Sequence, residues 1–94
     1  MASWRKLLAR MVADPNPRSY SYEEAATVLN HLGFALAKPT GGSHRKWRRS
    51  LETETGRRTV IIGLVERGSG TMKPEYIKDM VAQLRANDLL PSHL

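Results

Sequence analysis

The chain has 94 residues, no cysteine and a net charge of +6. This length suits one domain with a single modest core and is too short for two. The lack of cysteine excludes disulfides, zinc–thiolate sites and thiol nucleophiles. No segment approaches the roughly 20 consecutive apolar residues of a membrane-spanning helix. We therefore expect a cytoplasmic protein, without a membrane partner, whose fold depends on packing alone.

The positive charge is concentrated in the middle of the chain. Between residues 38 and 58 the cations are Lys38, Arg45, Lys46, Arg48, Arg49, Arg57 and Arg58. Only Glu52 and Glu54 oppose them there, so this segment carries most of the net charge. A dense basic patch indicates an anionic partner, and nucleic acid is favoured because its charge is continuous. A solvated charged surface without a ligand is the alternative.

A short helix is expected over residues 4–13. Apolar residues spaced at i, i+3, i+4 and i+7 form one stripe there: Trp4, Leu7, Leu8 and Met11. The Asp14-Pro15 pair ends this helix, since proline disfavours a helical residue before it. We expect a single domain, residues 1–94, in which residues 1–14 add a helix to a main body at residues 20–90.

The main body begins with a second helix. Ser21 and Glu24 form an S-x-x-E capping box, which predicts a helix start at Tyr22. The apolar stripe that follows is Ala25, Val28, Leu29 and Leu32. Gly33 supplies the left-handed residue that commonly closes a helix. His31, next to that end, is interpreted as a capping or surface residue.

Three strands and a last helix follow. Strands are predicted at residues 34–37, 43–51 and 58–62, with residues 63–65 trailing and a turn at 53–56. Pro74 suits the first turn of a helix. The stripe of that helix is Ile77, Met80, Val81 and Leu84, and Asn87 or Asp88 ends it. Helices with one apolar stripe must cover one face of a sheet. The fold predicted is an α+β two-layer sandwich, with a three-stranded antiparallel sheet whose other face is in water.

Residues 41–49 are the strongest candidate for a functional surface, because they combine a histidine with dense positive charge. Gly41 and Gly42, at the start of this run, permit a tight turn with room for a phosphate. In the strand after them, His44, Lys46 and Arg48 share one face, and Arg45, Trp47 and Arg49 share the other, where Trp47 points to the core. A histidine between cations suits proton transfer on a polyanion. The predicted RNA-binding residues are Lys38, Gly42, Ser43, Arg45, Lys46, Arg48, Arg49, Arg57 and Arg58.

The motifs that the sequence lacks limit the possible chemistry. It has no phosphate-binding loop ending in Lys-Ser or Lys-Thr, no H-E-x-x-H motif and no cluster of acids, so no metal or cofactor is expected. Without a metal-activated water, the easiest nucleophile is the 2′-hydroxyl of RNA itself. His44 could withdraw the 2′ proton while the cations balance the charge on phosphorus, leaving a 2′,3′-cyclic phosphate and a 5′-hydroxyl. The sequence shows no second proton-transfer group.

Three short motifs resemble the HicA family of toxin messenger-RNA interferases. They are Leu32-Gly33-Phe34, Gly42-Ser43-His44 at a strand start, and Lys73-Pro74 before a helix containing Ile77. The resemblance spans about residues 22 to 86. It implies a double-stranded-RNA-binding-domain-like αβββα fold and a metal-independent endoribonuclease with His44 as its catalytic residue. The segment at residues 63–68 lacks the His-Pro that many members have, and the N-terminal helix is an addition.

The resemblance also implies a biological role and partners. The chain would be the toxin of a type II toxin-antitoxin system, with messenger RNA as substrate and a HicB-type antitoxin that masks His44. Two other functions stay open: a non-catalytic RNA-binding module of the same architecture, and an interaction domain whose basic face contacts an acidic protein. RNA cleavage distinguishes the enzyme from the module, and salt-sensitive RNA binding distinguishes both from the interaction domain.

Overall fold

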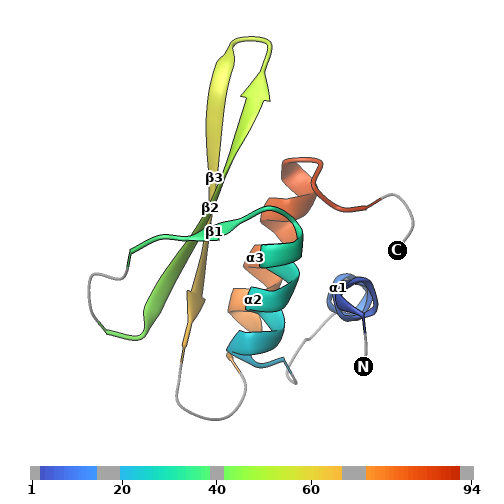
Figure 1. The fold of residues 1–94 in the computed structure, drawn as a ribbon. Coiled ribbons are helices and arrows are strands. Elements are labelled where there is room, and N and C mark those ends of the chain that lie inside the picture. The colour runs from blue at the N-terminus through green and yellow to red at the C-terminus, as the bar shows by residue number, and fades with distance from the viewer. Residues whose placement is uncertain (1–2, 15–19, 39–41, 67–71, 92–94) are drawn as a thin grey trace.

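The computed structural model describes residues 3–14, 20–38, 42–66 and 72–91. Its elements, in chain order, are α1 (Trp4–Ala13), α2 (Tyr22–His31), β1 (Ala35–Leu36), β2 (His44–Thr53), β3 (Gly56–Val65) and α3 (Pro74–Ala86). Helices pack on one side of an antiparallel sheet, which confirms the predicted α+β class and its extra N-terminal helix (Figure 1). Among the residues described, none of the helices has the length and apolar character needed to cross a membrane.

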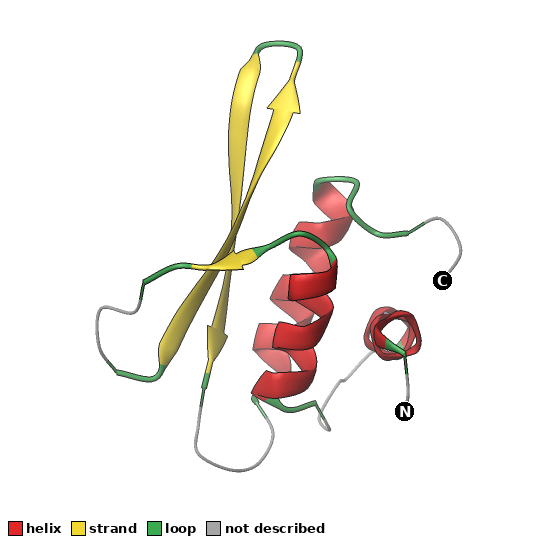
Figure 2. Ribbon diagram, in the orientation of Figure 1, coloured by secondary structure: helices red, strands yellow, loops and turns green. Residues whose placement is uncertain are grey.

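The sheet has the strand order β1-β2-β3. β2 and β3 pair over their full lengths, from His44 opposite Val65 to Thr53 opposite Gly56. Both strands are longer than predicted at the turn, because backbone pairing continues through exposed polar residues that carry no hydrophobic signal. β1 pairs only with the middle of β2, through Ala35 opposite Arg48 and Leu36 opposite Trp47. The far half of the β2–β3 hairpin therefore extends beyond the helices (Figure 2).

Local sequence signals set the ends of the two helices next to the sheet. The Ser21 hydroxyl accepts a hydrogen bond from the Glu24 N–H, and the Glu24 carboxylate accepts one from the Ser21 N–H, so the capping box is present. Gly33, with φ +87°, turns the chain from α2 towards β1. Pro74 opens α3 as predicted, and Asn87 caps its end.

The core lies between one face of the sheet and the layer formed by α2 and α3. Its fully buried side chains come from both layers: Val28, Leu29, Ile62, Leu64, Ile77, Met80 and Leu84. Trp47 is 8% exposed, which confirms its predicted place in the core. Residues of β2 and β3 that alternate with these point to the opposite, uncovered face of the sheet.

Helix α1 packs against α2 and α3 on the side away from the sheet (Figure 2). Leu8 and Met11 of its apolar stripe are buried in the common core cluster. At its start, the Trp4 ring stacks on His31, with ring centroids 5.4 Å apart. His31 is exposed, as predicted, and lies far from the uncovered face of the sheet.

Candidate functional site

One face of the sheet carries the predicted histidine and two of the predicted cations. His44, Lys46 and Arg48 alternate along β2 and are all exposed, whereas Trp47 between them is buried. The register places Val65, Gly63 and Ile61 of β3 opposite these residues on the same face. We call the surface formed by His44, Lys46 and Arg48 the basic face. Its three side chains follow one another at about 7 Å, the repeat of alternate residues in a strand.

His44 is the first residue of β2, and two local features fix where it stands. Gly42, with φ +67°, makes the turn that precedes the strand, a conformation that other residues rarely adopt. The Ser43 carbonyl then accepts a hydrogen bond of 2.7 Å from the Glu66 N–H, which continues the hairpin ladder one pair past His44. His44 is therefore held at the end of the sheet. Among the described residues, its ring has no hydrogen-bond or ion-pair partner.

Arg45 lies on the helix side of the sheet and makes a different kind of contact. Its Nε donates to Glu66 Oε1 at 3.0 Å, and its Nη1 donates to the carbonyls of Gly42 and His44 at 2.8 and 3.0 Å. The Arg45 guanidinium therefore bridges Gly42, in the turn before β2, and Glu66, the residue after β3. Glu66 is not among the predicted site residues, since only the hairpin register brings it beside Arg45.

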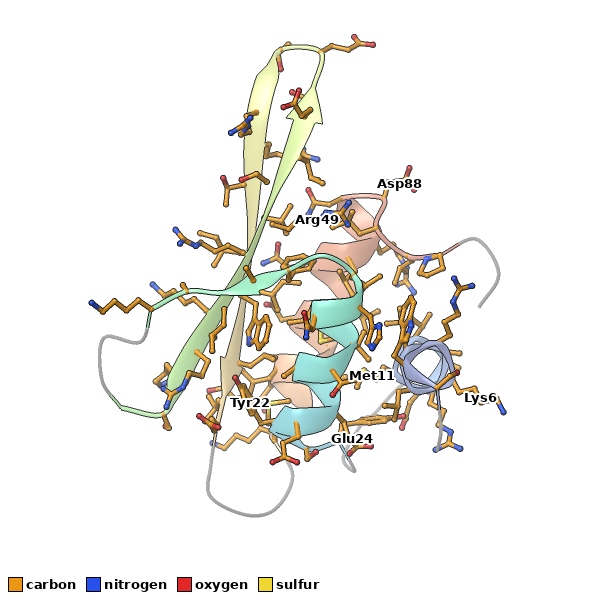
Figure 3. The ribbon with its side chains drawn as sticks, viewed as in Figure 1. Lys6, Met11, Tyr22, Glu24, Arg49 and Asp88 are labelled. Atoms are coloured by element: carbon orange, nitrogen blue, oxygen red, sulfur yellow. The ribbon has the colours of Figure 1, made fainter. Side chains whose placement is uncertain are left out.

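Arg49 is also on the helix side, where Figure 3 shows it between the hairpin and the helices. Its Nη1 donates to the Leu32 carbonyl at 2.6 Å, at the C-terminal end of α2. A cation there satisfies a helix-end carbonyl and interacts favourably with the helix dipole. The same side chain lies over Gly33, where an added Cβ would come within 3.5 Å of its Nε. Arg49 thus joins the sheet to α2.

The other predicted RNA-binding residues do not join the basic face. Arg57 shares its side of the sheet but lies near the hairpin tip, where it forms an exposed ion pair of 3.2 Å with Glu52. Arg58 is exposed on the opposite side, and Lys38 is exposed after β1. Exposed pairs such as that of Arg57 contribute little stability. Among the predicted cations, the structure brings Lys46 and Arg48 together with His44 along one face of β2.

An open depression adjoins the basic face beside β1. It is lined by Gly33, Ala35, Arg48, Arg49, Ser50 and Thr59. Ser50 and Thr59 are paired across β2 and β3, and both are exposed. Their hydroxyls can hydrogen-bond a phosphate or a ribose next to Arg48. These two residues are not among the predicted site residues, although alternation from His44 along β2 identifies Ser50, and the hairpin register then identifies Thr59.

The surroundings of His44 limit the acid–base chemistry available. In the strand register, its neighbours on the same face are Val65, which is buried, and Lys46 with Gly63. Lys46 is thus the ionisable side chain next to it on that face. Within the described ranges, no group of three or more histidines or acids is placed to hold a metal ion.

No family model, curated protein or solved structure matches this chain.

Proposed function

We propose that this protein is a metal-independent endoribonuclease with His44 as its general base. The observation that supports the proposal is the exposed position of His44 beside Lys46 and Arg48, on a side of the sheet that none of the described helices covers. A catalytic base must reach its proton, and a polyanion must reach the cations around it. The basic face meets both requirements for an extended RNA strand.

The reaction uses the 2′-hydroxyl of RNA as its nucleophile. His44 takes the 2′ proton while the 2′-oxygen forms a bond to the adjacent phosphorus. The bond from phosphorus to the 5′-oxygen then breaks, and that oxygen takes a proton from solvent. Lys46 and Arg48 stabilise the negative charge that develops on the phosphate oxygens. The products are a 2′,3′-cyclic phosphate and a 5′-hydroxyl, and DNA is not a substrate because it lacks the nucleophile.

The resemblance of the Gly42-Ser43-His44 run to the HicA family supports a biological role as well. In this role the protein is a cytoplasmic toxin of a type II toxin-antitoxin system and cuts messenger RNA. A HicB-type antitoxin would bind the basic face and mask His44. An acidic or RNA-like surface on that partner would match the positive charge of the face.

A non-catalytic RNA-binding module is the second candidate. One observation favours it. Among the described residues, Lys46 is the only ionisable neighbour of His44 on the same face of the sheet. No described carboxylate or second histidine is therefore next to His44 on that face to act as a second proton-transfer group. Such a module would use the same cations and the hydroxyls of Ser50 and Thr59 to hold phosphates and riboses. It would bind RNA and leave it intact.

Incubation of single-stranded RNA with the purified protein in excess EDTA tests the proposal. The enzyme cuts the RNA under these conditions, because no step needs a metal. RNA that is bound in a filter assay but stays full-length would contradict the nuclease and support the binding module. RNA that is neither bound nor cut would contradict both.

The basic face itself can be tested with two double variants of equal charge. Lys46→Gln with Arg48→Gln should lower RNA affinity about tenfold or more, because it removes two charge-assisted phosphate contacts. The slope of affinity against salt should fall by about 2, roughly 1 for each contact. Filter binding over a range of salt concentrations measures both quantities.

Lys6→Gln with Lys78→Gln is the matched control. Both lysines are exposed, Lys6 points away from the sheet in Figure 3, and Lys78 lines a pocket with Met11 and Val12 of α1. The control removes the same net charge, but its lysines lie away from the basic face, so it should leave the salt slope nearly unchanged. Equal losses in the two double variants would show that RNA responds to total charge and that the basic face is not the binding surface.

A further inference from the structure

The outer edge of β3 carries backbone groups that no described strand pairs. The Lys46 carbonyl accepts a hydrogen bond from the Ala37 N–H, so the backbone polar groups of Lys46 face β1. Backbone direction alternates along an antiparallel strand, so the pair of Lys46 with Gly63 exchanges no hydrogen bonds. The N–H and C=O of Gly63 therefore point away from β2, as do those of Ile61 and Thr59.

Beyond Arg57 and Arg58, this edge lacks the features that usually protect a free strand. Natural sheets guard their edges with charged residues, proline, bulges or very short strands. From Thr59 to Val65, β3 contains no charge and no proline, and its pairing with β2 has no bulge. At its centre, Ile61 is 46% exposed. The opposite edge of the sheet is formed in part by β1, which has only two residues.

We propose that β3 pairs with β3 of a second copy of this chain, antiparallel and centred on Ile61. This register sets Ile61 against Ile61, Thr59 against Gly63 and Arg57 against Val65. The outward N–H and C=O groups of the exposed residues Thr59, Ile61 and Gly63 then all have a partner. Val65, at the end of the strand, is buried. A shift to a centre on Thr59 or Gly63 leaves some of these groups unpaired. The exposed Ile61 side chains are in contact in this register and cover each other.

The charges of β3 favour this antiparallel self-pairing over a parallel one. Arg57 and Arg58 lie at the hairpin end of the strand. In the antiparallel register they lie opposite Val65 and Leu64 of the second copy, so the arginines of the two copies are at opposite ends of the contact. Parallel pairing would set the same arginines side by side, and like charges in that position are destabilising. The charges of two β3 strands therefore favour antiparallel pairing over parallel pairing.

The pairing has a consequence for the basic face. The two-fold axis runs perpendicular to the sheet, so both copies present His44 on the same side of one continuous sheet. The helices of both copies lie on the other side. Because Ile61 pairs with Arg48 within a copy and with the partner's Ile61 between copies, the row of Arg48 continues across the contact to the partner's Arg48.

Sedimentation velocity over a range of protein concentrations tests the proposal, with two lysine variants. The wild type should form a dimer as concentration rises. Ile61→Lys should be a monomer throughout, because two lysines would meet at the centre of the contact. Leu36→Lys is the matched control: Leu36 is 45% exposed and lies on β1, so this variant should dimerise like the wild type. A wild type that stays monomeric, or equal effects of the two variants, would overturn the proposal.

Amide hydrogen exchange of the wild type gives a second, residue-specific test. At low concentration, the N–H groups of Thr59, Ile61 and Gly63 should exchange rapidly, since they point to solvent. In the dimer they should become protected. The N–H groups of Val60 and Ile62 point towards β2 and should be protected at every concentration. A dimer in which the Ile61 and Gly63 amides still exchange rapidly would place the contact elsewhere and refute β3 pairing.

Discussion

Replacing His44 with alanine should reduce RNA cleavage by roughly 100-fold to 10,000-fold, the usual contribution of a general base. The imidazole removes the 2′ proton in the proposed reaction, and alanine cannot. The side chain is exposed and has no partner among the described residues, so its loss should change stability by less than about 0.5 kcal/mol. Initial rates of RNA cleavage, together with a thermal melt, measure the two effects.

His31→Ala is the control for this variant. His31 is exposed at the end of α2 and stacks on Trp4, on the far side of the helices from the basic face. Its substitution should leave cleavage at the wild-type rate. RNA affinity of the His44→Ala protein should stay near that of the wild type, because Lys46 and Arg48 remain. A His44→Ala protein that still cuts RNA at the wild-type rate would exclude His44 as the base.

Ile62→Ala should lower the free energy of unfolding by about 2 to 5 kcal/mol. Ile62 has no exposed surface and packs between β3 and the helices. Its truncation removes apolar contacts and leaves a cavity that the surrounding side chains only partly fill. A loss of this size is a large part of the stability of a small domain. Urea denaturation followed by circular dichroism measures it.

Ile61→Ala is the matched control for the core prediction. Ile61 is the preceding residue on the same strand, but it points to the uncovered side of the sheet. At protein concentrations low enough for a monomer, its truncation should cost less than about 1 kcal/mol. Equal losses for the two isoleucines would mean that both faces of the sheet are covered, and the basic face would then not be open to RNA.

Much of the fold follows from local patterns in the sequence. The stripe Ile77, Met80 and Leu84 predicts a helix with one buried face, and these three residues are fully buried in α3. Ser21 and Glu24 predict the start of α2, because a capping box is a contact between residues three apart. The alternation of His44, Trp47 and Arg48 predicts which residues share a face. Each of these signals lies within a few residues of the chain.

The partners of Arg45 and Arg49 depend on contacts between distant residues, which local patterns do not contain. Arg45 and Glu66 are 21 positions apart, and Arg49 and Leu32 are 17 apart. Alternation along the predicted strand already places both arginines on the side of Trp47, opposite Arg48. The hairpin register and the packing of α2 determine what they contact there, namely the turn before His44 with Glu66, and the end of α2. Composition alone therefore overestimates the number of cations on the basic face.

One assay tests the central claim most directly: cleavage, in excess EDTA, of an RNA that carries a single 2′-deoxyribose at a position the protein cuts. The proposed reaction predicts that this position becomes resistant while the other sites are still cut, and that each upstream fragment ends in a 2′,3′-cyclic phosphate. If the deoxyribose position is cut as fast as before, the nucleophile is not the 2′-hydroxyl and the proposed role of His44 is wrong.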